Sequence, residues 1–148
     1  MTKVLLAFAS LIAVIIAFAF YQKMTLPFAK IQNHEFQLII AKTEEQKQIG
    51  LSKNTKLDQN QAMLFIFDKP DYYRFWMKDM KFPIDIIFIK DNKIVKIYKN
   101  APILKDPVDD LPIYSPSEPI DKVLETNAGV SEKYNFKVGE RVEFRNVR

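Results

Sequence analysis

The sequence predicts an α+β domain that is mainly β, a small partly closed antiparallel β-barrel or sheet with two short helices. A hydrophobic helix is expected to precede it at the N-terminus. Three observations lead to this fold class. Short runs rich in β-branched and aromatic residues recur from residue 35 onward and are separated by turn residues. Two stretches between these runs have the signals of short helices, and the first residues form one uninterrupted apolar run.

Residues 1–21 are predicted to be a signal-anchor or a signal peptide. The run from Val4 to Phe20 would be about 26 Å long as a helix, just under the ~30 Å of the hydrocarbon core. The polar residues 21–23 are typical of the end of a membrane span, whereas AFA at 17–19 has the form of a signal-peptidase site. We expect residues 4–20 to hold the chain in the cell membrane with the domain outside the cytoplasm. The alternative is a periplasmic or secreted protein cleaved near Ala19.

The composition excludes several classes of function. The 148 residues are 48% hydrophobic and 27% charged, as expected of one globular domain. The net charge is +4 and no basic run tracks a phosphate backbone, so no nucleic-acid partner is expected. The absence of cysteine excludes disulfides and a thiolate nucleophile, and the single His34 leaves no basis for a transition-metal site. We therefore expect no metal and no cofactor.

The first half of the domain predicts strands around one short helix. A tether is expected over residues 22–33, followed by a single globular domain over 34–148. EFQLIIA (35–41) has the composition of a strand, and Thr43 with Gln46 forms a capping-box pattern that opens a helix. AMLFIFD (62–68) is apolar on both faces, which indicates a buried strand.

The middle of the chain predicts a further strand and a hairpin. In YRFWMKD (73–79), alternate residues from Tyr73 to Met77 are expected to point into a core, and the residues between them away from it. PIDIIFIKDNKIVKIYK (83–99) predicts an antiparallel hairpin, because Asp91 and Asn92 tolerate the left-handed conformation of a tight turn.

A proline-rich segment separates the hairpin from the last elements. Residues 100–120 hold five of the eight prolines, which deny the segment ladder hydrogen bonds and predict a long loop, either a lid or a mobile segment. KVLETNA (122–128) then predicts a strand and GVSEKYNF (129–136) a short helix. A turn at Gly139 leads into the last strand.

Six blocks of the sequence resemble, in family order, the prokaryotic family catalogued as domain of unknown function 192. They are TEEQKQIGLS, AMLFIFD, FWMKDMKFPIDIIFI, IYSPSEP, VLETNAG and KVGERVEF. FWMKDMKFPIDI is the most specific of them, while Ser52, Ala62 and Asp79 depart from the usual pattern. The resemblance implies a small β-rich fold, frequent export and no established activity.

Arg74, Trp76 and Lys78 are candidate ligand-binding residues on one strand face. An indole between two cations is suited to a sugar, an aromatic ring or an anionic group. The alternative is a solvated strand face whose tryptophan is partly covered by the proline-rich loop. Tyr114, in that loop, is a further ligand-binding candidate.

Asp85 is the first candidate carboxylate, because it lies between apolar residues, and Glu125 in VLETNAG is the candidate second carboxylate. A carboxylate in apolar surroundings must find hydrogen bonds or a cation, or else take up a proton. The functional interpretation of Asp85 is a general acid or a ligand anchor, with Glu125 as a second carboxylate. The preferred alternative is that Asp85 accepts hydrogen bonds from backbone amides.

The predicted function is therefore a non-catalytic extracytoplasmic module, tethered or secreted, that binds a small molecule, an envelope component such as a glycan, or a protein partner at the Trp76 face. The alternative is a carboxylate-dependent hydrolase or lyase that uses Asp85 and Glu125. A third interpretation is a structural or chaperone-like accessory protein. Asp106, Asp109 and Asp110 lack the spacing and the glycine of a Ca²⁺ loop.

Overall fold

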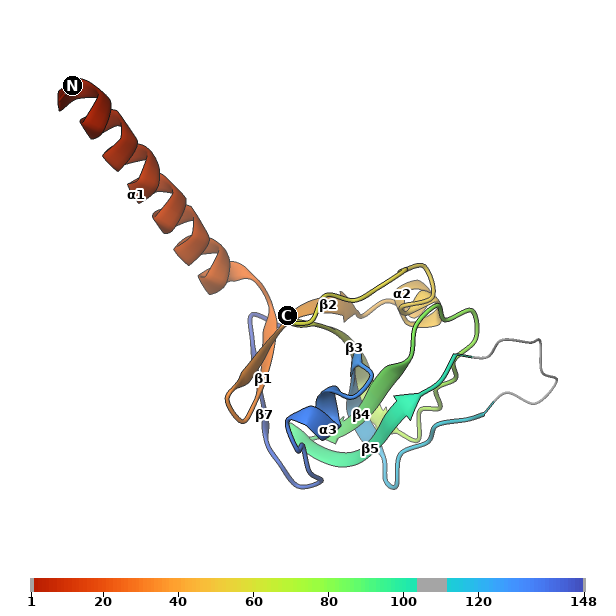
Figure 1. Ribbon diagram of the computed structural model, residues 1–148. Helices are drawn as coiled ribbons and strands as arrows, with labels where there is room; N and C mark the ends of the chain where they lie inside the picture. Colours follow the sequence, from red (N-terminus) through yellow and green to blue (C-terminus); the bar gives the residue numbers. More distant parts are fainter. Residues whose placement is uncertain (1, 104–111, 148) are drawn as a thin grey trace.

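The structure, a computed structural model, describes residues 2–103 and 112–147 and is dominated by one sheet (Figure 1). Its elements are α1 (Thr2–Thr25), β1 (Phe28–Ile31), β2 (His34–Ala41), α2 (Glu44–Ile49), β3 (Gln61–Asp71), β4 (Ile84–Lys90), β5 (Lys93–Ala101), β6 (Ile120–Asn127), α3 (Val130–Lys133) and β7 (Val142–Arg145). The predicted mainly β, α+β class is confirmed, with α2 and α3 as the two short helices.

The described strands form a seven-stranded sheet in the order β5-β4-β6-β3-β2-β1-β7. All neighbouring pairs are antiparallel except β2 and β3, which run parallel with Gln37 opposite Gln61 and Ala41 opposite Phe65. The predicted antiparallel sheet thus contains one parallel pair. A parallel pair needs a crossover connection, and α2 with the loop that follows it supplies one.

The sheet curls until its two edge strands approach each other at one end. Lys93 at the start of β5 forms an isolated antiparallel bridge with Arg141, just before β7. The N–H of Ile94 donates to the carbonyl of Glu140 over 2.9 Å, and the N–H of Val142 donates to the carbonyl of Asn92 over 2.8 Å. The predicted partial closure of the barrel is therefore confirmed.

Both faces of the sheet are buried, which explains why β4 is buried from Ile84 to Ile89 and is apolar there except at Asp85. The inner cluster gathers side chains from all seven strands, which can meet only inside the curl; its buried members are Ala29, Ile31, Phe36, Leu38, Ala62, Leu64, Ile87, Ile89, Ile94, Leu124, Phe136 and Val142. The outer cluster lies on the opposite face; its buried members are Ala41, Leu51, Leu57, Met63, Phe65, Met77, Ile84, Ile86, Phe88, Ala101, Ile120 and Val123.

The β4–β5 hairpin confirms the prediction over residues 83–99. Asp91 and Asn92 have φ values of 49° and 60°, the left-handed conformation that a two-residue turn requires. At the other end of the pair, Ile84 lies opposite Ala101 but Ile86 lies opposite Tyr98, so β5 carries one extra residue there. This bulge brings Asn100, with φ of 54°, beside Asp85.

Two segments differ from the prediction. Residues 28–31 were expected in the tether but form β1, because their alternating side chains Ala29 and Ile31 complete the inner cluster. Residues 73–79 do not form a strand; Phe75 makes one bridge with Tyr114 and the rest is irregular. The predicted alternation still holds in part, because Met77 is buried while its neighbours are exposed.

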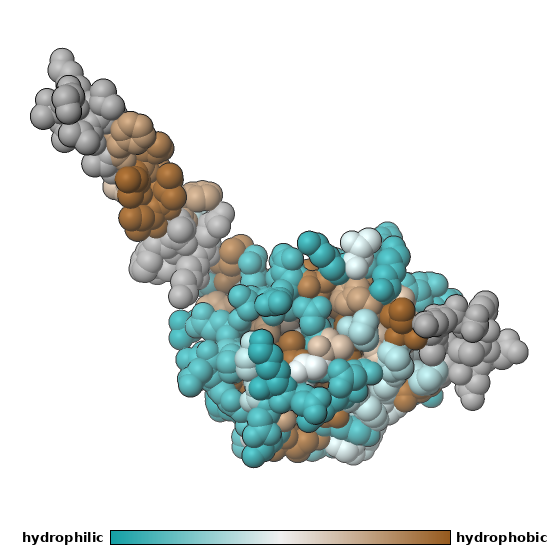
Figure 2. Space-filling view, viewed as in Figure 1, coloured by the Kyte–Doolittle hydropathy of each residue, from teal (hydrophilic) through white to brown (hydrophobic). Residues whose placement is uncertain are grey.

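The helix α1 extends away from the sheet (Figure 1), and Figure 2 shows its described apolar side chains in contrast to the largely hydrophilic face of the domain. Counting only residues that the structure describes, no helix combines the length and the apolar composition needed to cross a bilayer. The membrane anchor through residues 4–20 and the cleavage near Ala19 remain predictions from the sequence.

Candidate functional site

Trp76 is the only tryptophan of the chain and lies at a groove on the convex side of the sheet. The groove has a volume of about 410 Å³ and lies between α2, the end of β3 and the segment that follows β3. Its lining residues are Glu44, Lys47, Gln48, Phe67, Asp68, Lys69, Tyr73 and Trp76. The Trp76 side chain is 55% exposed, an unusual position for a large aromatic side chain and one that offers its ring to a ligand.

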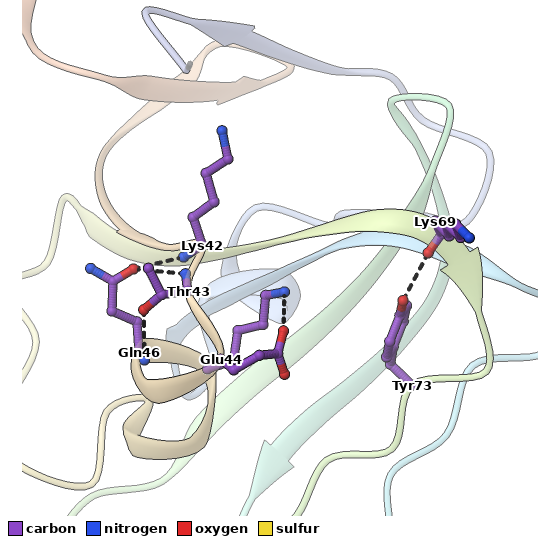
Figure 3. A network of polar contacts seen from close by, with 7 residues as sticks. Lys42, Thr43, Glu44, Gln46, Lys69 and Tyr73 are labelled. Carbon is purple, nitrogen blue, oxygen red and sulfur yellow. Dashed lines mark hydrogen bonds and ion pairs between the residues drawn. The ribbon is translucent and has the colours of Figure 1, made fainter.

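The capping box of α2 fixes one wall of this groove (Figure 3). The Thr43 hydroxyl accepts the N–H of Gln46 over 3.2 Å, and Gln46 Oε1 accepts the N–H groups of Thr43 and Lys42, each over 3.0 Å. This confirms the predicted capping box, which satisfies backbone donors that a helix N-terminus would otherwise leave free. The helix then presents Glu44 and Lys47 to the groove from one side.

Lys47 is held in place by two interactions. Its ammonium lies 2.9 Å from Glu44 Oε1 and 4.8 Å from the centre of the Phe67 ring. The Lys47 side chain is only 12% exposed, whereas that of Glu44 is 82% exposed. The Lys47 ammonium therefore already has a carboxylate and an aromatic ring as partners within the protein, whereas most of the Glu44 side chain remains exposed to solvent.

The opposite wall of the groove is an aromatic pair. The rings of Phe67 and Tyr73 stack with centroids 3.6 Å apart and planes 12° apart. The Tyr73 hydroxyl donates to the carbonyl of Lys69 over 2.8 Å, which ties the segment after β3 back onto the strand (Figure 3). Tyr73 was expected in the core; it is half-buried, packs against the outer cluster and also lines the groove.

The other predicted residues of the Trp76 face do not line the groove. Arg74 and Lys78 are exposed on either side of Trp76 in the chain, but neither is among the lining residues. Tyr114 packs against the outer cluster, and its ring meets that of Tyr98 edge-on at 5.1 Å. Tyr114 therefore covers the sheet and is not among the residues that line the groove, although its backbone pairs with Phe75, the neighbour of Trp76.

Asp85 has the structural role that the sequence analysis preferred. Its side chain is fully buried, and it accepts backbone N–H groups from Asn100 over 2.8 Å, Gly129 over 3.1 Å and Ser131 over 2.7 Å. These three donors occupy both carboxylate oxygens. Backbone amides stabilise the charged form of a buried carboxylate in this way.

Glu125 is buried, and within the described part of the chain its carboxyl group receives no such backbone hydrogen bonds. Across the sheet it lies opposite Met63 on one side and Ile86 on the other, and it is 6% exposed. Burial raises the pKa of its carboxyl group to about 8, because the charged form loses hydration that nothing nearby replaces. At neutral pH this side chain is therefore mainly protonated.

The two carboxyl groups lie on opposite faces of the sheet. In the β4–β6 pair Asp85 is opposite Thr126 and Ile86 is opposite Glu125, and successive residues of a strand point to opposite faces. Asp85 shares the inner face with Ile87, whereas Glu125 shares the outer face with Ile86. The predicted pairing of Asp85 and Glu125 is wrong, and the hydrolase or lyase interpretation loses its geometric basis.

Among the residues that the structure describes, no group of three or more His, Cys, Asp or Glu side chains is placed to hold a metal ion. Asp106, Asp109 and Asp110 lie outside the described residues, as does the middle of the proline-rich segment.

The sequence profile of a family described as DUF192, Uncharacterized ACR, matches residues 28–144, which is nearly the whole domain. The chain belongs to the DUF192 family. The resemblance seen in the six sequence blocks is thereby confirmed. The matched range begins at Phe28, the first residue of β1, so the family profile includes this strand in the domain.

Two solved structures share the fold of this DUF192 chain. A protein of unknown function from Novosphingobium aromaticivorans is 29% identical with a TM-score of 0.71, over 80% of this chain and 83% of that one. A protein from Sinorhizobium meliloti, described as a candidate transcription regulator, is 26% identical with a TM-score of 0.71, over 82% of this chain and 93% of that one. Comparison with curated proteins finds no match.

Most of the groove was missed by sequence reasoning. Trp76 is the one predicted ligand-binding residue that lines it. Apart from Tyr73, the other lining residues come from α2 and the end of β3, up to about thirty positions away. The charged pair Glu44 and Lys47 at helical spacing was a detectable local signal. Nothing in the sequence of this DUF192 domain relates that pair to Trp76, because the crossover from β2 to β3 brings them together.

Replacement of Asp85 by Asn is expected to destabilise the domain by about 1 to 3 kcal/mol. The amide keeps the shape but puts an N–H₂ group where an oxygen accepts backbone N–H groups. Urea unfolding of the full-length chain measures the change. Asp79→Asn is the matched control, because Asp79 is exposed and Asn tolerates its φ of 59°. Equal stability of both variants and the parent would refute the structural role of Asp85.

The raised pKa of Glu125 makes a prediction about stability and pH. Between the ordinary value of 4.5 and about 8, the folded state keeps a proton that the unfolded state releases, so this group's contribution to stability falls as pH rises through that window. Glu125→Gln should remove this slope. The free energy of unfolding of Glu125→Gln is expected to exceed that of the parent by roughly 2 to 5 kcal/mol at pH 8, and the difference is expected to vanish near pH 4.

Urea unfolding of the parent and of Glu125→Gln at pH 4, 6 and 8 measures this effect. Glu132→Gln serves as the control for the loss of one carboxylate, since Glu132 is exposed at α3. Parallel stability curves for the parent and Glu125→Gln across this range would contradict a protonated Glu125.

Proposed function

We propose that this DUF192 protein is a non-catalytic binding module whose ligand lies in the groove at Trp76. The observation that carries the proposal is a half-exposed single tryptophan in a groove of about 410 Å³ that also holds a stacked aromatic pair and four charged side chains. Pockets with an apolar surface and a few fixed polar groups are the usual form of small-ligand sites.

The arrangement of the two buried carboxyl groups supports binding over catalysis. Asp85 is occupied by three backbone N–H groups, and Glu125 is enclosed on the other face of the sheet. Neither of them is among the residues that line the Trp76 groove. The carboxylates that do line it, Glu44 and Asp68, are on the exposed surface and suited to accept hydrogen bonds from a ligand.

The test is fluorescence of the full-length chain, in which Trp76 is the only tryptophan. Titration with size-fractionated envelope extract is expected to shift the emission to shorter wavelength and to protect the indole from acrylamide, because a ligand would cover its exposed half. Backbone amide shifts of Gln48 and Asp68 should follow the same saturation curve.

The matched control for this titration is Trp76→Phe, with binding followed by the same amide shifts. This variant keeps an aromatic ring and should retain weaker binding. Emission and quenching that stay unchanged in every fraction, together with unmoved groove amides, would disprove the binding-module proposal.

We also propose that residues 4–20 hold this module at the cell membrane with its domain outside the cytoplasm; the alternative is release after cleavage near Ala19. The apolar run and the short polar segment that ends it support this location. Fractionation and N-terminal sequencing are expected to give membrane-bound chain that starts at Met1, or released chain that starts at Phe20. Soluble full-length chain in the cytoplasm would contradict both.

A further inference from the structure

We infer that the groove at Trp76 binds a neutral sugar ring, as part of an oligosaccharide. The inference rests on the proposed function and names the chemical class of its ligand. Three features of the groove support it. The charges that line the groove balance, the Phe67 ring already contacts the Lys47 ammonium, and hydrogen-bond donors and acceptors both line the groove beside the exposed indole.

The charges that line the groove disfavour an ionic ligand of either sign. Two carboxylates, Glu44 and Asp68, face two ammonium groups, Lys47 and Lys69, so the groove has no net charge. Glu44 and Lys47 already form an ion pair at 2.9 Å. An anion would meet both carboxylates and a cation would meet both ammonium groups, whereas a neutral ligand meets no net repulsion.

The aromatic groups of the groove are not free to form a cage around a cation. The face of Phe67 is taken by the Lys47 ammonium at 4.8 Å, and Phe67 also stacks on Tyr73. Trp76 is different, because in the described part of the chain it takes part in no ring pair and in no cation–π contact. Its indole is the available platform, and the C–H face of a sugar ring is a good partner for such a surface.

Hydroxyl groups match the polar rim of the groove. Carboxylates accept hydrogen bonds only and ammonium groups donate only, while the side-chain amide of Gln48 does both. A sugar hydroxyl donates and accepts, so neighbouring hydroxyls can satisfy Asp68 and Lys69 together. An apolar ring or a simple aromatic ligand would form no hydrogen bonds with these groups and would displace water from any of them that it covered, at a cost that weakens binding.

The test is titration of the full-length chain, in a detergent without a sugar headgroup, with four probes. Two are neutral hexasaccharides, one of glucose and one of N-acetylglucosamine; the others are inorganic polyphosphate and a peptide with trimethyllysine. At least one hexasaccharide is expected to shift the emission of Trp76 saturably at millimolar concentration. Polyphosphate and the trimethyllysine peptide should cause no saturable change in emission.

Variants distinguish a sugar site from a charge site. Trp76→Ala, followed by calorimetry, should weaken hexasaccharide binding about tenfold or more. Asp68→Asn should weaken it about threefold to tenfold, because an acceptor for hydroxyls becomes weaker. If the groove bound anions, the same change would strengthen polyphosphate binding instead. Tyr72→Ala is the control, since Tyr72 is 57% exposed but does not line the groove, and should leave affinity unchanged.

The outcomes separate this inference from the proposed function. Hexasaccharide binding that needs Trp76 supports both. Binding of polyphosphate or of the trimethyllysine peptide alone, or hexasaccharide binding that survives Trp76→Ala, overturns the sugar inference. If none of the four probes changes the Trp76 emission while the envelope extract still does, the sugar inference is overturned but the binding-module proposal is supported. If neither the four probes nor the envelope extract changes the Trp76 emission, both the sugar inference and the binding-module proposal are overturned.

Discussion

The buried carboxylate of Asp85 is the contact on which the closed end of the barrel depends. It gathers N–H groups from the bulge of β5, from the turn after β6 and from the start of α3. Two of these donors belong to residues with left-handed backbone, Asn100 and Gly129, whose turns leave those N–H groups outside the ladders of the sheet. Without an acceptor they would be buried and unpaired, which is more costly than the hydrogen bonds are worth individually.

The position of α3 matters because the chain that follows it closes the curl of the sheet. From the end of α3 the chain runs through Phe136, a member of the inner cluster, to the bridge between Arg141 and Lys93. The strand β7 then pairs with β1 at the other edge. Asp85 thus fixes the starting point of the segment that joins the two edges, and the inner cluster fills the space that this closure creates. Packed side chains occupy the interior of this DUF192 barrel, so a ligand must be sought in the layer outside it.

That outer layer consists of connections rather than of a second sheet. The crossover through α2, the segment after β3 and the described part of the proline-rich segment cover the convex face, and their apolar side chains join the outer cluster. The groove at Trp76 lies where two of these connections meet. Carboxyl groups in the protein have correspondingly different surroundings. Asp85 is buried and accepts three backbone N–H groups, burial raises the pKa of Glu125 to about 8, and Glu44 on α2 is largely exposed to solvent.

The local sequence accounts for the β-rich class, the hairpin at Asp91 and Asn92, the capping box at Thr43 and the family. Each depends on residues that are close in the chain, where backbone preferences and hydrogen bonds within a few positions decide the outcome. The structural role of Asp85 was also preferred correctly, since a lone carboxylate among apolar residues needs backbone donors. Four other features could not be predicted from the sequence: the parallel pairing of β2 with β3, the inclusion of β1 in the sheet, the opposite faces of Asp85 and Glu125, and the lining of the groove. These features depend on strand register and on a crossover between distant segments, and such contacts are chosen by the packing of the whole core rather than by any neighbouring residues.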